Sequence, residues 1–449
     1  MTDMSKLKQQ ISDALDEAMD YSQADQTEVL AVAHDGALTR YSNSYIHQNV
    51  AEKNVHLSVR TIKDKKIGYA STNRLDKRSV QKTVDTTIEI GKQRPEDAQF
   101  KSLPKSKTPA PTDSFFQTSA DFSPRQRAET VRLIIEKATK SKLSAAGALS
   151  NEAAILGVAN SLGTKSIQPL TQVSLNTVIS SSSSSGFASF ISRDIEELDA
   201  ETLANTAIEK ALLSENPIGI EPGEYTVILE EEAVGQLISF LAFIGFGALA
   251  FQEQRSFVCG KIDQSIAGNN ITIWDDAIDN RTIGFPFDFE GVPKQKVVLI
   301  EKGIAKNVVY DSYTAQRENK ESTGHALPAP NPYGPIPFNL FLQPGDSSMQ
   351  KMISSTAKGI LITRFHYANI EDPMKTILTG MTRDGTFLIE NGAVTKGIKN
   401  LRITQSILEA LSKVELISKK TRLVDSGFGA CNVPVLKIKD FNFTGITEF

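Results

Sequence analysis

Cysteine is scarce in this chain, which has only Cys259 and Cys431 among its 449 residues. Small secreted proteins that depend on a disulfide framework use many more cysteines for their length, so the sequence excludes that class. The first residues, MTDMSKLKQQISDALDEAM, also lack the apolar core of a signal peptide. Both absences lead us to expect a cytoplasmic protein.

The chain also has no excess of positive charge. Its 49 Lys and Arg residues are outnumbered by 53 Asp and Glu residues, which gives a formal net charge of -4. A dedicated nucleic-acid-binding protein needs a basic face for phosphates. Short basic runs such as KDKK at residues 63–66 are interrupted by acid and are typical of a solvated surface. We therefore expect no nucleic-acid partner.

Charge is absent altogether from residues 233–252. An apolar segment of about 20 residues is long enough to span a bilayer. Three glycines and the polar Gln236 and Ser239 interrupt this one, however, and no Lys/Arg cluster flanks it to set an orientation. Its apolar residues recur at helical spacing, namely Leu237, Phe240, Leu241 and Ile244. The pattern predicts a buried core helix and no membrane partner.

The rest of the composition, with 40% hydrophobic and 23% charged residues, is that of a globular protein long enough for two or three domains. Residues 1–216 predict an N-terminal domain of strands and helices. Apolar runs at residues 28–33 and 55–59 predict two strands, and Asp35-Gly36 between them is a hairpin turn signal. Residues 93–121, rich in Pro, Lys and Ser, predict a surface linker.

A second copy of the strand pattern is a possibility that the sequence leaves open. Residues from Ala153 onward again run apolar strand, turn and alternating strand, but short strand pairs resemble one another. Helices are expected next to each copy. Asp76 is a suitable N-cap for one, and Ser123-Pro124 is a suitable start for another.

Residues 217–449 predict a larger, strand-rich C-terminal domain, so the fold class is α+β. Lys302-Gly303 and Asn391-Gly392 follow similar apolar strands and predict tight hairpin turns. A helix is expected over about residues 404–416. The longest irregular stretch, residues 310–346, holds five prolines between Pro328 and Pro337, which would keep it extended and able to line a cleft.

The start of the core helix, EEAVGQ at residues 231–236, is similar to an altered metal-binding signature. Together with other segments it resembles the TldD/TldE (PmbA) family, described both as modulators of DNA gyrase and as metalloproteases. The segments that carry this resemblance are LTRYSNSYIHQNV, GYASTNRLD, EPGEYTVILEEEAVG, FDFEGVPKQKVVLIEKG, ESTGHALP and GMTRDGTFLIENG.

The resemblance implies a zinc site that is altered in this chain. The family's catalytic subunit carries His-Glu-x-x-x-His on this helix and a zinc-binding cysteine near its C-terminus. Glu231 and Gln236 stand at the two histidine positions, Glu232 at that of the general base, and Cys431 near that of the cysteine. A catalytic zinc usually has three protein ligands, and Gln236 offers only a weak neutral carbonyl. We expect no metal and no catalytic residue here, with Glu231 and Cys431 as atypical ligand candidates.

By the same resemblance, the chain is a TldE-type, non-catalytic subunit whose TldD-like partner supplies the zinc. The substrates would be unfolded peptides or flexible protein tails. Candidates for the substrate cleft are His325, Ser322, Thr323 and Arg255. Two alternatives remain: an active metallopeptidase with an atypical set such as Glu231, Glu232, Cys431 and His325, or a regulatory protein that acts on gyrase. No other cofactor is implied.

Overall fold

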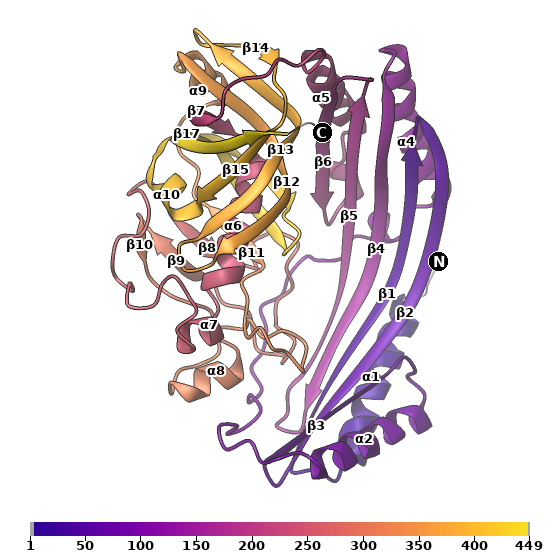
Figure 1. Ribbon diagram of the computed structural model, residues 1–449. Helices are drawn as coiled ribbons and strands as arrows, with labels where there is room; N and C mark the ends of the chain where they lie inside the picture. Colours follow the sequence, from indigo (N-terminus) through magenta and orange to yellow (C-terminus); the bar gives the residue numbers. More distant parts are fainter. Residues whose placement is uncertain (1–3, 448–449) are drawn as a thin grey trace.

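The computed structural model describes residues 4–447 and has two parts that stand side by side (Figure 1). The N-terminal part is a tall six-stranded antiparallel sheet in the order β3-β2-β1-β4-β5-β6. Its strands are β1 Gln26–Ser42, β2 Tyr45–Lys63, β3 Lys66–Thr72, β4 Ser144–Asn160, β5 Lys165–Ser180 and β6 Ser185–Ser192. Its helices are α1 Met4–Tyr21, α2 Lys77–Lys92, α3 Gln117–Ala120, α4 Pro124–Lys140, the short 3-10 turn η1 Ile195–Glu197, and α5 Ala200–Leu213.

The N-terminal part is built from two copies of one helix–three strands–helix unit. The first is α1-β1-β2-β3-α2 and the second is α4-β4-β5-β6-α5. The copies meet where β1 pairs with β4 in antiparallel register, with Asp35 opposite Ala153. The helices α1 and α2 therefore lie at one end of the sheet, and α4 and α5 lie at the other (Figure 1). The second copy begins with α4 at Pro124, earlier in the chain than Ala153, where the sequence pattern suggested a start.

The predicted hairpin turn at Asp35-Gly36 is wrong. Both residues lie inside β1, opposite Lys53 and Glu52 of β2. The turn comes at Asn43-Ser44, where both residues have positive φ, at 51° and 59°. Tight two-residue hairpins need this conformation, and asparagine adopts it readily. Asp35-Gly36 does not form a turn because β1 pairs with both of its neighbours, β2 and β4, through these two residues.

The predicted helix starts are confirmed. Asp76 caps α2 by accepting a hydrogen bond from the Ser79 backbone. Ser123 caps α4 in a reciprocal capping box with Gln126. The segment 93–121 has no regular structure apart from α3, but it does not lie wholly on the surface, because Phe100 and Leu103 are buried. The boundaries 1–216 and 217–449 stay a prediction.

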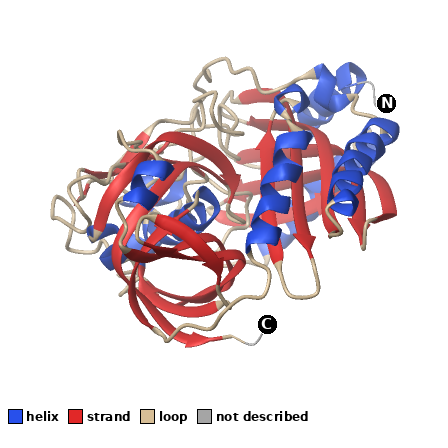
Figure 2. Ribbon diagram, turned by 90° about the horizontal axis from the view of Figure 1, so that it is seen from above, coloured by secondary structure: helices blue, strands red, loops and turns tan. Residues whose placement is uncertain are grey.

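The C-terminal part is a mixed sheet whose strands β7, β12, β13, β15 and β17 form a closed ring, because β7 pairs with both β12 and β17. Figure 2 shows these strands curving around the helices of this part. Its strands are β7 Gly223–Leu229, β8 Ile273–Asp275, β9 Val297–Glu301, β10 Ile304–Ala305, β11 Asn339–Leu342, β12 Lys358–Asp372, β13 Ile377–Glu390, β14 Ala393–Gly397, β15 Leu401–Ser406, β16 Val414–Asp425 and β17 Ala430–Ile446. Its helices are α6 Glu231–Gly245, α7 Ala248–Gln252, α8 Ser312–Arg317, α9 Met349–Ser354 and α10 Ile407–Ser412.

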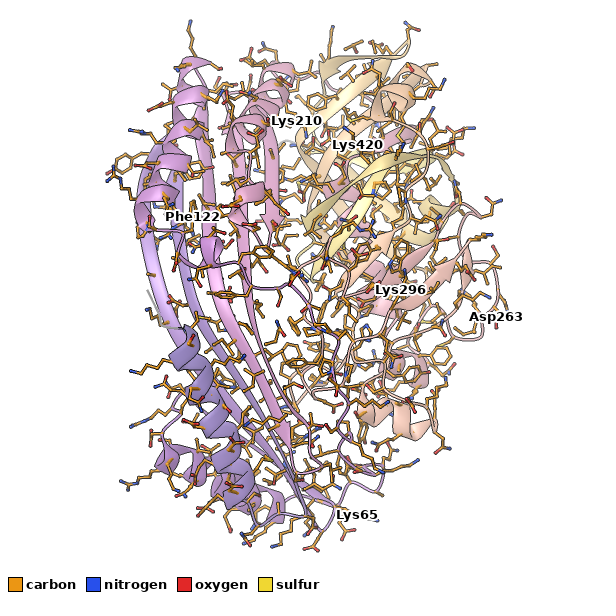
Figure 3. All side chains as sticks on the ribbon, turned by 180° about the vertical axis from the view of Figure 1, so that it is seen from behind. Lys65, Phe122, Lys210, Asp263, Lys296 and Lys420 are labelled. Atoms are coloured by element: carbon orange, nitrogen blue, oxygen red, sulfur yellow. The ribbon has the colours of Figure 1, made fainter. Side chains whose placement is uncertain are left out.

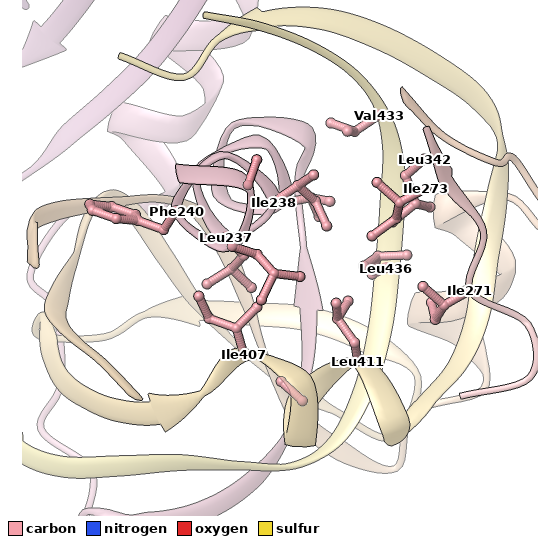
Figure 4. Packing of buried hydrophobic residues seen from close by; sticks show 14 of the residues in the cluster. Leu237, Ile238, Phe240, Ile271, Ile273, Leu342, Ile407, Leu411, Val433 and Leu436 are labelled. Carbon is pink, nitrogen blue, oxygen red and sulfur yellow. The ribbon is translucent and has the colours of Figure 1, made fainter. Parts of the chain in front are cut away.

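Helix α6 is a core helix, as predicted. Nearly every residue from Ala233 to Ala242 is buried, and Figure 4 shows Leu237 facing Ile407 of α10, with Leu436 of β17 nearby. Within the described residues, no helix is long and apolar enough to cross a membrane. The sequence stretch that first resembled a membrane span is therefore the hydrophobic centre of the C-terminal part.

The two predicted hairpin turns of this part are confirmed, with positive φ at Lys302-Gly303 and at Asn391-Gly392. The predicted helix over residues 404–416 is too long. Only residues 407–412 are helical, because residues 404–406 pair with β13 as part of β15, and residues from Val414 onward pair with β17 as part of β16. The proline-rich loop packs against the end of α6, where Tyr333 lies 6.0 Å from Phe243 between ring centroids.

Candidate functional site

The altered motif lies at the first turn of α6, directly after β7. Glu230 is the N-cap residue, and Glu231 and Glu232 occupy the first turn. Carboxylates are favoured there because unpaired backbone N–H groups and the helix dipole make the N-terminus positive. All three face the boundary between the two parts of the molecule, where they line a cavity. The N-terminus of α6 therefore places three adjacent carboxylates in one wall of this cavity.

A cation from another strand lies between two of these carboxylates. Arg422 of β16 places Nη1 3.1 Å from Glu232 Oε1 and Nε 3.5 Å from Glu231 Oε2. The same Nη1 donates to the backbone carbonyl of Ser189 on β6, at 3.1 Å. The Ser189 hydroxyl in turn donates to Glu232. Arg422 thus joins the start of α6 to the edge strand of the N-terminal sheet.

Neighbouring carboxylates keep the guanidinium of Arg422 protonated. Burial by itself would lower the pKa of the guanidinium, but the carboxylates of Glu232, Glu231 and Glu230 act against it and raise the pKa above its ordinary value. Arg422 therefore stays positive at every pH at which the protein is folded. Glu232 Oε1 accepts hydrogen bonds from both the Ser189 hydroxyl and Arg422 Nη1. The ion pair with Arg422 therefore fixes the position of this carboxylate.

Cys431 of β17 lies beside α6, as its place in the sequence led us to expect. Its side chain is fully buried, and Sγ is 3.6 Å from the carbonyl oxygen of Gly235. Burial raises the pKa of the Cys431 thiol to about 12. The free thiol therefore stays protonated at neutral pH. Cys431 therefore acts as a small apolar side chain that packs against the helix.

Glu232 lies in the wall between two cavities at the boundary of the two parts. One has a volume of about 350 Å³ and is lined by Glu231, Arg422 and residues of β6 and α5. The other, of about 340 Å³, is lined by Gln236, Arg364 and several of the same β6 residues. Lys210 of α5, which Figure 3 shows at the boundary between the two parts, forms an ion pair with Glu230. The site is thus shared between both parts.

These residues do not fit a catalytic zinc. The position that lies between the two carboxylates is taken by the Arg422 guanidinium, and Gln236 offers only a neutral carbonyl oxygen. Over residues 4–447, no three His, Cys, Asp or Glu side chains come together in a way that could hold a metal ion. The atypical set of Glu231, Glu232, Cys431 and His325 is therefore not assembled as one ligand group.

None of the four residues predicted for a substrate cleft lines either of the two cavities beside Glu232. His325 is fully buried, where Nε2 lies 2.9 Å from Asp275 Oδ1 and Nδ1 lies 2.9 Å from the Thr323 hydroxyl. Burial lowers the pKa of His325 despite the nearby carboxylate. Ser322 and Thr323 donate to the carbonyl of Tyr310, and Arg255 pairs with Glu253. The structure gives His325 a place in the interior, not in a cleft.

Sequence reasoning missed Arg422 and Ser189. Neither residue belongs to a motif, and each lies far from residues 230–232 along the chain. One signal was available, because three consecutive glutamates at the start of an otherwise uncharged core helix cannot all be brought near the core without cations. The sequence requires such partners but does not say which of its 49 Lys and Arg residues supply them.

Both the N-terminal and the C-terminal part of the chain match domains of one known family. Residues 222–445 match the PmbA/TldA metallopeptidase C-terminal domain, and residues 27–91 match the PmbA/TldA metallopeptidase domain 1. This chain belongs to the PmbA/TldA metallopeptidase family. The family's C-terminal domain covers β7, α6 and β17, so it includes Glu232, Arg422 and Cys431.

Curated relatives agree with this assignment. An uncharacterized protein of Methanocaldococcus jannaschii is 29% identical over 272 residues, which are 60% of this chain and 63% of that protein. A metalloprotease TldD homolog of Haemophilus influenzae is 26% identical over 238 residues, which are 52% of this chain and 49% of that protein. The matched region thus spans 49% to 63% of the length of these relatives.

Solved structures share the fold across nearly the whole chain. TldE from Thermococcus kodakarensis superposes with a TM-score of 0.89 at 21% identity, covering 97% of this chain and all of that one. A protein of Thermotoga maritima described as a candidate modulator of DNA gyrase superposes with a TM-score of 0.84 at 18% identity, covering 93% of this chain and 96% of that one. At this level of identity the likeness establishes the fold.

Proposed function

We propose that this chain is the non-catalytic subunit of a two-chain metallopeptidase of the PmbA/TldA family. Its partner is a family member that carries the intact His-Glu-x-x-x-His motif and holds the zinc. The two chains together act on unfolded peptides or flexible protein tails. The likeness to TldE over the full length of both chains supports this assignment.

The observation that carries the proposal is the ion pair of Arg422 with Glu231 and Glu232. A catalytic zinc keeps an open position where it activates a water molecule. A guanidinium offers only N–H donors, so it balances the charge of the two carboxylates without activating anything. The side chains at the motif positions thus stabilise the boundary between the two parts of the molecule instead of supporting hydrolysis.

The cavities at this boundary support a role in holding peptides. The cavity next to Glu232 has apolar residues such as Phe187, Phe190 and Leu203 in its wall, besides the charged ones. Its volume of about 350 Å³ is within the range of pockets that accept small ligands or side chains. A subunit with such cavities can bind part of a flexible substrate although it has no catalytic group of its own.

Co-expression with a family member that carries the intact motif tests this function. We expect the two chains to co-purify as a stable heteromer, with peptidase activity in the mixture and none in this chain alone. A matched control replaces the motif glutamate of the partner by glutamine, which should abolish activity without affecting assembly. The proposal is wrong if the partner cleaves peptides equally well alone and the two chains do not associate.

A further inference from the structure

The outer edge of the N-terminal sheet is covered along only part of its length. β1 pairs with β2 along the whole of this strand, whereas β3 pairs with it only from Leu57 to Lys63. Figure 1 shows β2 along the outer side of the sheet, with β3 at the end near α2. Among residues 4–447, no strand and no isolated bridge pairs with the outer side of residues 45–56. These residues form the open edge of β2.

The open edge of β2 is also uncovered on both faces of the sheet. Successive side chains of a strand point to opposite faces, and every residue from 47 to 54 is exposed. Two apolar residues, Tyr45 and Val50, are 71% and 38% exposed. The other edge strand, β6, is instead bound to the C-terminal part through Ser189. Unpaired backbone groups beside exposed apolar side chains favour pairing with a strand of another chain.

The β2–β3 hairpin determines which backbone groups the open edge presents. Its turn, Asp64-Lys65, has positive φ at both residues, and Lys63 and Lys66 flank it. The flanking pair of such a two-residue hairpin exchanges both backbone hydrogen bonds, and hydrogen-bonded pairs then alternate along the strands. Odd-numbered residues of β2 therefore direct N–H and C=O outward as far as the bulge at His47. A second copy of β2 must place its own odd-numbered residues opposite these.

The end of β3 limits where a second copy of β2 can pair. Two identical edges meet in antiparallel direction about a two-fold axis. With Val50 opposite Val50, the β2 strand of the second copy starts opposite Val55, and its turn lies beside Leu57, where the pairing with β3 begins. The next register that matches odd-numbered residues has Ala51 opposite Ala51, and it would place Tyr45 of the second copy against β3. Registers shifted the other way pair fewer residues, so the open edge fits the register centred on Val50.

The side chains agree with this register. Because Val50 is even-numbered, the two valines form a pair without backbone hydrogen bonds, the kind in which side chains come closest. Branched apolar side chains in such a pair stabilise each other. Glu52 lies opposite Gln48, so no two carboxylates face each other. Lys53 is held over its own sheet, where Nζ lies 3.2 Å from Asp35 Oδ2. The open edge is therefore complementary to a second copy of itself.

We propose that two copies of this chain join through the open edge of β2, with Val50 on the two-fold axis. The six strands of each N-terminal part then form one continuous antiparallel sheet. The pairing covers Val50 of both copies and satisfies the outward backbone groups of Asn49 and Ala51. It needs no other protein, so this inference goes beyond the proposed function, and each of the two can fail without the other.

Sedimentation equilibrium of the full chain tests this dimer. We expect a reversible dimer of twice the 49.0 kDa chain, with a dissociation constant on the order of 10 µM because the contact is a single strand pair. Ala51→Pro should weaken dimerisation about tenfold or more, since proline removes an outward N–H that only the second copy uses. Ser71→Pro is the matched control, because the N–H of Ser71 faces outward on β3, away from the open edge, and the dimer should be unchanged.

Disulfide trapping tests the register itself. Val50→Cys places two cysteines opposite each other with Cα atoms about 4.5 Å apart, which is within the range for a disulfide. Gln48→Cys is the control, because its two copies lie about 13 Å apart along the strands. Mild oxidation should give a covalent dimer with Val50→Cys and far less with Gln48→Cys. The unmodified chain, whose Cys259 is half-buried and Cys431 buried, gives the background.

Three results would each overturn the proposal. They are a chain that stays monomeric up to about 100 µM, ten times the expected dissociation constant, a dimer that Ala51→Pro leaves unchanged, and equal cross-linking of Val50→Cys and Gln48→Cys. Thermal unfolding shows whether each variant is folded. If Ala51→Pro does not fold, the two cysteine variants still decide, because neither removes a backbone hydrogen bond.

Discussion

At the scale of single residues, the altered motif shows how one side chain changes the chemistry of a site. The resemblance implies that Glu231 and Gln236 stand where the family's catalytic subunit has histidines. The structure adds that Arg422 lies between Glu231 and Glu232. This contact could not be predicted, because nearly two hundred residues separate the partners along the chain and ion-pair partners have no local sequence pattern.

Glu232→Gln is the substitution that tests the role of this residue. In a reconstituted complex we expect peptidase activity within a few-fold of the unmodified complex, since Glu232 pairs with Arg422 and has no metal-bound water to deprotonate. The measurement is kcat/KM on a flexible peptide. The same substitution at the partner's motif is the control and should reduce activity by a factor of about 10² or more. A loss of that size from Glu232→Gln would show that this chain takes part in the chemistry.

At the scale of elements, the sequence predicts those helix starts and hairpin turns that short local signals determine. Helix caps at Asp76 and Ser123 and the turns at Lys302-Gly303 and Asn391-Gly392 follow local rules, and all are present. Where long-range pairing decides the structure, the local signal fails. The turn predicted at Asp35-Gly36 is a continuous strand, because both β2 and β4 pair with β1 through these positions.

Gly235 of α6 tests how closely the motif helix packs on its neighbours. A Cβ at this position would lie 2.4 Å from Cγ2 of the buried Val424 of β16. We expect Gly235→Ala to lower the free energy of unfolding by about 1–3 kcal/mol through overpacking, despite the better helix propensity of alanine. Urea unfolding measures this change.

The control for this prediction is the double variant Gly235→Ala, Val424→Ala. Removing the Val424 methyl groups makes room for the new Cβ, so the double variant should lose clearly less stability than the sum of the two single variants. Additive losses would mean that the strain in Gly235→Ala does not come from Val424.

At the scale of the whole molecule, a buried charge network fixes the two parts to each other. Arg60 of β2 places Nη2 2.7 Å from Glu28 Oε2 of β1 and 3.1 Å from Glu290 Oε1 of the C-terminal part. Glu290 also accepts a hydrogen bond from the backbone of Ser312 at 3.0 Å. All three charged residues are nearly inaccessible to solvent. The network has two carboxylates for one cation, so one negative charge is in excess.

The excess negative charge beside Arg60 predicts that the free energy of unfolding depends on pH. Burial raises the pKa of Glu28 from 4.5 to about 7, although Arg60 acts against it. In the folded state Glu28 keeps a proton that the unfolded chain releases above about pH 4.5. The contribution of this proton to the free energy of unfolding is complete below about pH 4.5 and is lost as the pH rises through about 7. The loss reaches about 1.4 kcal/mol per pH unit within that window.

Glu28→Gln isolates this effect, since it removes the titrating group and keeps the size of the side chain. Urea unfolding between pH 5 and pH 8 should show a flatter dependence for Glu28→Gln than for the unmodified chain, with the two curves diverging as the pH rises. Glu17→Gln is the control, because this carboxylate lies on α1 and pairs with Lys77 instead of Arg60. Parallel curves for Glu28→Gln and the unmodified chain would contradict the assigned titration.

The central claim is that Arg422, and not a metal ion, lies between the carboxylates at the start of α6. The most direct measurement is the zinc content of the purified chain after incubation with excess zinc and gel filtration, determined by elemental analysis. Far less than one zinc ion per chain is expected, because Gln236 is a poor ligand and Arg422 occupies the position between the two carboxylates and repels cations. One tightly held, chelator-sensitive zinc per chain, lost on Glu231→Gln or Cys431→Ser, would contradict the account.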